Sequence, residues 1–298
     1  MTPPERAAHA RFAPSLGTAF ELVRRDRGWL ALARDVVGFA ADDDAGWRRL
    51  TSEAWLLARW RAAGVPAPRV IDEDPARGVQ IRERMHGLTG EDVVSEPERS
   101  RLFDGALPDP RARIEGAPLS TFGERVAASY GELAARIRRA VPISDARAAG
   151  FTPTSRRTLD LDAAIARLHA TTASQAAKAT AARLRPWLAA LPPIDAVIHG
   201  DLHFFNMCLA DDGEIIGVFD VGDAGLDAAA TELLYIHSLG ARFAAIALDA
   251  YGPIDREAVE RAHLRTALDH LIWHPPGTPR HASIVVWATA AFERMARP

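Results

Sequence analysis

Three oxygen-bearing side chains, Asp201, Asn206 and Asp220, stand at positions from which they could bind a metal and act on a hydroxyl group. Asp201 follows a short apolar run, 196–198, and Asn206 comes five residues after Asp201. Asp220 closes a second apolar run, 215–219. Amide and carboxylate oxygens suit Mg²⁺, a hard cation that bridges phosphate oxygens, and a separate carboxylate can orient an acceptor hydroxyl and take its proton. The residue types therefore indicate phosphoryl transfer.

The chain between these residues predicts a hairpin that brings them together. Two apolar segments, 207–209 and 215–219, flank Ala210-Asp211-Asp212-Gly213, which is a strong turn sequence. Because a hairpin folds back on itself, Asp220 returns to the neighbourhood of Asp201. We expect the three polar side chains at one end of a small sheet.

The composition is that of an ordinary folded protein and argues against several other classes. The chain has 298 residues, of which 48% are hydrophobic and 25% charged, so we expect two packed lobes rather than one core. A net charge of −3 argues against a nucleic-acid binder, and the single cysteine, Cys208, allows no internal disulfide. The N-terminus lacks the apolar segment of a signal peptide, and charged residues interrupt the most apolar helical stretch, 233–251. We expect a cytoplasmic protein with no nucleic-acid or membrane partner, and nothing indicates its oligomeric state.

Hydrophobic periodicity predicts an α+β fold of two lobes. Residues 1–87 form a small β-sheet lobe with one helix, and residues 88–298 form a larger, mostly helical lobe that begins with a connector, 88–120. The prediction of the smaller lobe is based on three segments with strand character, 20–23, 29–34 and 79–85, and on one with helical periodicity, 47–57.

The spacing Asp-x-x-x-x-Asn, followed by a hairpin and a second Asp, is that of the protein kinases. His199-Gly200-Asp201 stands where those enzymes have His-Arg-Asp, which indicates a branch that acts on small molecules. Over about residues 16–240, and most clearly over 197–226, the chain resembles the aminoglycoside phosphotransferase and choline kinase-like family. The resemblance implies the protein-kinase-like fold and an ATP-dependent O-phosphotransferase that moves the γ-phosphoryl group to a hydroxyl of a small molecule.

The same resemblance assigns roles to residues of the larger lobe. Asp201 would be the catalytic base or the group that orients the hydroxyl. Asn206 and Asp220 would hold Mg²⁺ and, through it, the phosphates of ATP. His203 is either a brace of the loop or a contact of the acceptor, and Asp223 is either an acid beside the metal or a cap of a following helix.

In the smaller lobe, the resemblance makes Glu53 the helix carboxylate that pairs with a cation on the third strand. Met85-His86-Gly87 would lie at the hinge, where adenine hydrogen-bonds to the backbone, and Glu83 would also belong to the cofactor-binding residues. The only lysine in the chain is Lys178, so the strand cation cannot be a lysine. We expect Arg34, at the end of a strand, to take this place, since arginine binds carboxylate and phosphate through two parallel hydrogen bonds.

Three other functions stay open. A nucleotide-binding pseudoenzyme is favoured by the missing lysine and by a single glycine, Gly17, where a glycine-rich loop would cover the phosphates. A protein Ser/Thr kinase would use the same scaffold. Gly200-Asp201-Leu202-His203 also resembles the motif of two-metal phosphoesterases, which need further metal ligands.

For the acceptor, we expect a small hydroxylated metabolite rather than an aminoglycoside. An aminoglycoside is a polycation and would favour an acidic pocket. Phe204-Phe205 stands where the family often has small residues or proline, which would reshape the acceptor side of the pocket.

Overall fold

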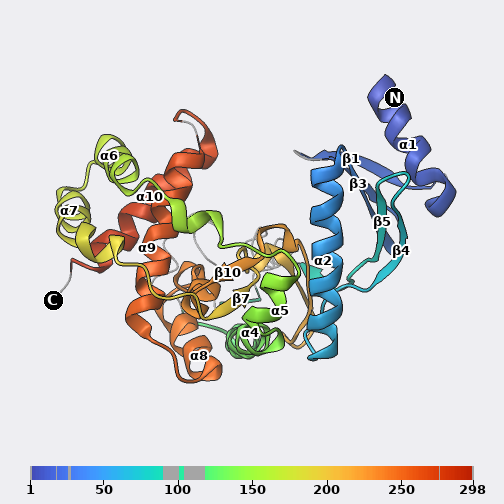
Figure 1. Cartoon of the computed structure of the whole chain (residues 1–298). Coiled ribbons are helices and arrows are strands. Elements are labelled where there is room, and N and C mark those ends of the chain that lie inside the picture. The colour runs from blue at the N-terminus through green and yellow to red at the C-terminus, as the bar shows by residue number, and fades with distance from the viewer. Residues whose placement is uncertain are drawn as a thin grey trace.

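The computed structural model describes residues 2–17, 19–25, 28–89, 101–103, 118–274 and 276–296. It has two lobes, with an N-terminal sheet at one end and a larger helical region at the other (Figure 1). The α+β, two-lobed architecture predicted from the sequence is confirmed.

The N-terminal lobe is built on a sheet of five strands in the order β1-β2-β3-β5-β4, in which every neighbouring pair is antiparallel. β1 and β2 form a hairpin, as expected, and residues 26 and 27 of its turn lie outside the described residues. The five strands are β1 (Glu21–Arg25), β2 (Gly28–Leu32), β3 (Val36–Ala41), β4 (Val70–Asp74) and β5 (Val79–Glu83).

Two helices, α1 (Pro3–Leu16) and α2 (Asp44–Ala62), cover the two faces of this sheet. On one face, Gly38 of β3 meets α1 so closely that a side chain there would collide with the ring of Phe12. We expected only one helix in this lobe, α2. The sequence gives little sign of α1 because this helix buries only two residues and has no continuous apolar stripe.

The sheet register decides which side chains face α2. Val37 of β3 pairs with Arg82 of β5, and Phe39 pairs with Gln80. Paired residues share a face and successive residues alternate, so these four side chains lie on one face. The Nε2 of Gln80 donates a hydrogen bond of 3.1 Å to the carbonyl of Leu50 in α2, so this is the face that α2 covers.

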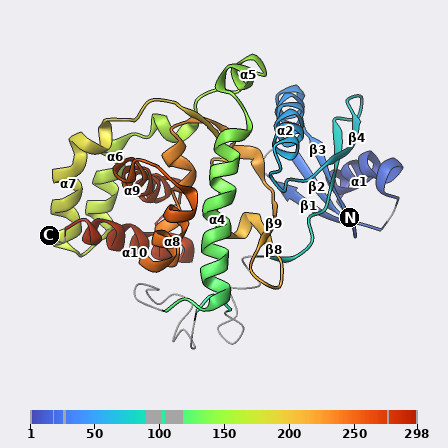
Figure 2. The same cartoon turned by 90° about the horizontal axis from the view of Figure 1, so that it is seen from below.

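The C-terminal lobe consists mostly of helices, with α4 lying between α8 and the hairpin β8–β9 (Figure 2). Its α-helices are α4 (Thr121–Ala140), α5 (Ile143–Ala148), α6 (Leu161–Thr171), α7 (Gln175–Ala189), α8 (Ala241–Tyr251), α9 (Arg256–Trp273) and α10 (Pro279–Arg294). Short 3₁₀ helices occupy Ser155–Thr158, Phe204–Asn206, Val221–Asp223, Ala229–Leu233 and Ile236–Leu239.

A small island of β-structure stands among these helices. β7 pairs with β10, and a second sheet has the order β6-β8-β9, so the predicted hairpin is β8–β9. Much of the expected connector between residues 88 and 120 lies outside the described residues. The strands are β6 (Leu88–Thr89), β7 (Ala196–Ile198), β8 (Met207–Leu209), β9 (Ile215–Val218) and β10 (Gly225–Asp227).

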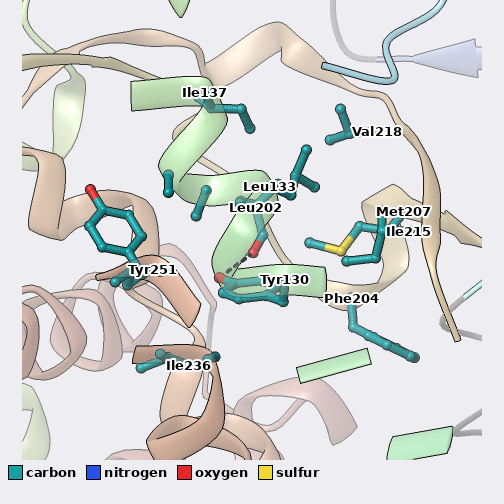
Figure 3. Close-up of a cluster of buried hydrophobic side chains, with 14 of the residues drawn as sticks. Tyr130, Leu133, Ile137, Leu202, Phe204, Met207, Ile215, Val218, Ile236 and Tyr251 are labelled. Carbon is teal, nitrogen blue, oxygen red and sulfur yellow. Dashed lines mark hydrogen bonds between the residues drawn. The ribbon is translucent and has the colours of Figure 1, made fainter. Parts of the chain in front are cut away.

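A buried cluster joins α4 to this island (Figure 3). Leu133 of α4 belongs to the same cluster as Met207 of β8 and Val218 of β9, and all three are almost completely buried. Tyr130 of α4 donates a hydrogen bond of 3.0 Å to the carbonyl of Leu202. Burial of one such apolar side chain contributes about 1.5–3 kcal/mol, so the cluster fixes the loop after β7 against a rigid helix. Within the described part of the chain, no helix is long and apolar enough to cross a membrane.

Candidate active site

A cleft of about 1270 Å³ lies between the two lobes. One wall comes from the N-terminal sheet and α2, and the other comes from the loop after β7, the end of the hairpin, and helices α9 and α10. Six of the predicted site residues line the cleft: Glu83, Met85, Asp201, His203, Asp220 and Asp223.

Hydrogen bonds tie the loop after β7 to the end of β9. The imidazole of His199 accepts from the backbone N–H of Asp201 through Nδ1 (3.3 Å) and therefore donates through Nε2 to the carbonyl of Phe219 (2.9 Å). The N–H of Phe219 donates in turn to the carbonyl of Asn206, at 3.0 Å. These bonds hold the loop that carries Asp201 and Asn206 against the end of β9, and Asp220 is the next residue after Phe219.

The carboxylate of Asp201 is held on both oxygens. Its Oδ1 accepts a hydrogen bond of 2.8 Å from the hydroxyl of Tyr235 and lies 3.6 Å from Nη2 of Arg156. Its Oδ2 accepts a bond of 3.1 Å from Nδ2 of Asn206 and lies 3.4 Å from Nε2 of His203. The carboxylate therefore has one orientation toward the cleft.

This environment keeps Asp201 ionised. Burial by itself would raise the pKa of the carboxyl, but the hydrogen bond and charge of His203, together with Tyr235 and Arg156, lower it well below its usual range. A carboxylate with so low a pKa is better suited to orienting a hydroxyl than to keeping its proton.

His203 and Asp223 occupy different parts of the site. Nδ1 of His203 accepts a bond of 3.0 Å from the N–H of Phe205, so the proton of a neutral His203 lies on Nε2, which faces Asp201. The histidine thus contacts its own loop, and because it also lines the cleft, its contact with an acceptor stays a prediction. Asp223 caps no helix, because the segment that follows it is the strand β10. Its carbonyl lies so close to Gly200 that only glycine, with its φ of 81°, fits there.

The side chains of Asn206 and Asp220 fit a magnesium ion. Asn206 uses its amide nitrogen on Asp201, which leaves the amide oxygen for a cation. Asp220 has φ 60° and ψ 56°, the one positive φ of a non-glycine residue in the described ranges, and such strain is typical of functional sites.

Within the described residues, no group of three His, Cys, Asp or Glu side chains could hold a metal. Mg²⁺ needs few protein ligands, because it keeps several waters and takes others from substrate phosphates. The donor set is therefore consistent with magnesium.

The expectation for Arg34 is wrong. Strand β2 ends at Leu32, and Arg34 is exposed in the turn before β3. The cations that pair with Glu53 are Arg82 of β5, at 2.7 Å, and Arg49 of α2, at 2.8 Å. The register explains the difference, because it is Arg82 whose side chain faces α2.

Two more of the predicted cofactor-binding residues, Glu83 and Met85, lie where the lobes connect. Glu83 is the last residue of β5, and its carboxylate lies 3.5 Å from Nη1 of Arg61. The side chain of Met85 packs closely against Gly217 of β9. The backbone between β5 and β6 thus borders the cleft, and its contact with adenine stays a prediction.

The sequence did not reveal three residues of the site: Arg82, Arg156 and Tyr235. Arg156 donates two hydrogen bonds, of 2.8 and 3.1 Å, to the carbonyl of Gly200, and Tyr235 is also 3.1 Å from Nε2 of His270. Arg156 and Tyr235 are far from Asp201 in the chain, and no local motif marks them. The alternation of residues 79–85 could have indicated Arg82, because it puts the side chain of Arg82 on the face of the strand opposite to that of Val79 and Ile81.

Fold and site together define a phosphotransferase of the protein-kinase-like class. The chain belongs to the phosphotransferase enzyme family, whose sequence profile matches residues 44–263. It is a small-molecule phosphotransferase. No curated protein matches the chain in sequence.

Three solved structures illustrate the similarity in fold. One is the GDP complex of aminoglycoside 2'-phosphotransferase-IIIa, with a TM-score of 0.68, 13% identity, and coverage of 99% of this chain and 100% of that chain. A second is macrolide 2'-phosphotransferase MphH from Brachybacterium faecium, with a TM-score of 0.61, 18% identity, and coverage of 98% and 95%. A third is a choline/ethanolamine kinase family protein from Mesorhizobium loti, with a TM-score of 0.58, 18% identity, and coverage of 99% and 95%.

Proposed function

We propose that this protein transfers the γ-phosphoryl group of ATP to a hydroxyl group of a small metabolite, with Asp201 as the residue that orients the hydroxyl. The observation that carries the proposal is the carboxylate of Asp201. It is half-buried, fixed on both oxygens, and placed on the cleft, which Asp220 also lines, in contact with Asn206. The similarity in fold to a GDP complex supports a purine nucleotide as the donor.

The geometry suggests how the residues of this chain would act. The acceptor hydroxyl donates a hydrogen bond to Asp201, which points the hydroxyl oxygen at the γ-phosphorus. As the new oxygen–phosphorus bond forms, the bond between the γ-phosphorus and the β,γ-bridging oxygen breaks, which yields ADP and a phosphate monoester. The proton passes to Asp201 and then to the product, because the pKa of Asp201 is too low for the carboxyl to keep it.

Asn206 and Asp220 would hold magnesium through oxygen atoms. When bound, Mg²⁺ neutralises charge on the phosphates. Oδ2 of Asp220 is 3.3 Å from Nη2 of Arg25 in the structure, which leaves Oδ1 as the oxygen that would hold the metal.

The acceptor end of the cleft supports a metabolite rather than a polycation. Arg156 lies 3.6 Å from Asp201 and 3.7 Å from Asp269, so it offsets charge on both carboxylates. Tyr235, Trp273 and Trp287 add aromatic surface to this part of the cleft, which Arg280 also lines. Such a surface suits a neutral or weakly charged alcohol.

An Asp201→Asn variant tests the proposal. Turnover on an acceptor found by screening alcohols, sugars and amino alcohols for ATP consumption should fall roughly 100-fold or more. Binding of ATP with Mg²⁺, measured by calorimetry, should change little, because Asp201 faces the acceptor. Asp211→Asn, which alters an exposed carboxylate in the hairpin turn, is the control.

Equal activity of Asp201→Asn and wild type would refute the assigned role. Strong selective turnover of kanamycin would overturn the preference for a metabolite. Nucleotide binding without turnover of any acceptor would favour the pseudoenzyme, and turnover of a protein substrate would favour the protein kinase. The kinase-like fold and the family membership leave the two-metal phosphoesterase without support.

A further inference from the structure

The third strand of the sheet lacks the cation that kinases place there. In protein kinases, a lysine on this strand contacts the nucleotide phosphates and pairs with a glutamate of the following helix. In this chain, β3 reads Val-Val-Gly-Phe-Ala-Ala. Its side chains that face α2 include Val37 and Phe39, and neither carries a charge.

Arg82 of the neighbouring strand occupies this space. Its guanidinium carbon lies 4.3 Å from the ring centre of Phe39. Nη2 donates to Glu53 at 2.7 Å, and Nε donates to Oε1 of Gln80 at 2.5 Å. Among the described residues, Nη1 has no hydrogen-bond partner, and Arg82 lines the cleft. The guanidinium is therefore held rigidly while one edge stays available.

Arg49 places a second guanidinium against the same carboxylate. Its Nε donates to Oε1 of Glu53 at 2.8 Å, and its side chain is 38% exposed. Nη2 lies so close to Gly222 that a side chain at that position would collide with it. Arg49 thus reaches the segment just after Asp220.

The charges around Glu53 do not cancel. Two guanidinium groups share one carboxylate, and both arginines line the cleft. Both arginines line the same cleft as Asp220, where the proposed function puts the phosphates. A buried, preorganised arginine binds phosphate oxygens well, because its planar group donates in a fixed geometry.

We propose that Arg82, with Arg49 beside it, is the phosphate-binding cation of this protein, in place of the strand lysine. The proposal rests on the proposed function, since it assumes that a nucleotide enters the cleft. Glu53 then has the role of positioning both guanidinium groups, and a cation from β5 replaces one from β3.

An Arg82→Met variant tests this by comparing a nucleoside with its diphosphate. Calorimetry should show that the variant binds ADP with Mg²⁺ roughly 10- to 100-fold more weakly than wild type, because charged hydrogen bonds are lost. Its affinity for adenosine should stay within about threefold. Arg77→Met is the matched control, since it removes a partly buried arginine of the same lobe, in the turn between β4 and β5, that pairs with Asp74 outside the cleft.

A lysine returned to β3 provides a second test. Phe39→Lys combined with Arg82→Met should recover at least part of the lost ADP affinity. If Arg82→Met does not fold, Arg49→Met addresses the same question with a more exposed side chain, and it should also weaken ADP more than adenosine.

The outcomes separate this proposal from the proposed function. Equal losses for adenosine and ADP, or unchanged ADP binding in both single variants, would overturn the role of the arginines while wild type still binds nucleotide. Failure of wild type to bind ADP or GDP would instead overturn the proposed function, and the arginine proposal with it.

Discussion

At the level of single residues, removal of the hydroxyl of Tyr235 tests the role proposed for Asp201 most directly. It donates to Asp201 at 2.8 Å and is one of the groups that keep the pKa of this carboxyl low. In Tyr235→Phe, one oxygen of Asp201 loses a charged hydrogen bond, so kcat should fall about tenfold with little change in the KM for nucleotide. Because the pKa of Asp201 rises toward its ordinary value, the acidic limb of the kcat profile should move to higher pH.

A pH–rate profile of wild type and Tyr235→Phe measures both effects. Tyr251→Phe is the control, because Tyr251 is a buried tyrosine of the same lobe that does not line the cleft. A lower kcat with no movement of the acidic limb would mean that Tyr235 acts on packing and not on Asp201.

The sequence predicted part of this site because some of it is local. Asp201, Asn206 and Asp220 are close in the chain or joined by a hairpin, so their spacing carries the information. The partner of Glu53 depends on the sheet register. Arg34 was predicted from its position in the sequence, whereas the pairing of β3 with β5 places Arg82 against Glu53. Contacts between distant segments, such as Tyr235 with Asp201, need the tertiary fold.

At the level of elements, the contact between α4 and α8 depends on one glycine. Gly131 of α4 is so close to the carbonyl of Ala247 in α8 that a Cβ there would collide with backbone. Gly131→Ala favours the helix intrinsically by about 1 kcal/mol. The collision should outweigh this gain and lower the free energy of unfolding by about 1–3 kcal/mol.

Urea unfolding of Gly131→Ala and wild type measures the change. Glu132→Ala, at the next and exposed position of α4, should leave stability nearly unchanged. Stabilisation of Gly131→Ala would show that the two helices can separate at no cost, contrary to this packing.

The helices and strands show the same limit of sequence reasoning. The mostly helical character of the C-terminal lobe and the hairpin β8–β9 were predicted from the sequence, because the hairpin has a strong turn sequence between two apolar segments. Helix α1 escaped prediction because Ala8 and Phe12 are its only buried residues. Its position is set by the sheet it covers and not by its own periodicity.

For the whole molecule, the buried carboxyl of Glu232 links stability to pH. Its Oε2 accepts a hydrogen bond of 2.6 Å from the backbone of His199, at the start of the loop that carries Asp201. Burial, with a contribution from the charge of Asp201, raises the pKa of Glu232 to about 8. The folded protein therefore keeps a proton here at neutral pH that the unfolded chain, with a glutamate pKa of about 4.3, has released.

The sign of the effect follows from this difference. A folded state that binds more protons than the unfolded state loses stability as pH rises. The contribution of Glu232 to the free energy of unfolding is therefore full below about pH 4 and disappears by about pH 8.

Glu232→Gln does not titrate and can keep the bond to His199. From pH 5 to pH 8, wild type should lose roughly 2–4 kcal/mol of unfolding free energy relative to Glu232→Gln. Urea unfolding across this range measures the difference, with Glu132→Gln on the exposed face of α4 as control. Parallel curves for wild type and Glu232→Gln would show that Glu232 is ionised in the fold, and the backbone at the start of the loop after β7 would then donate its hydrogen bond to a buried anion.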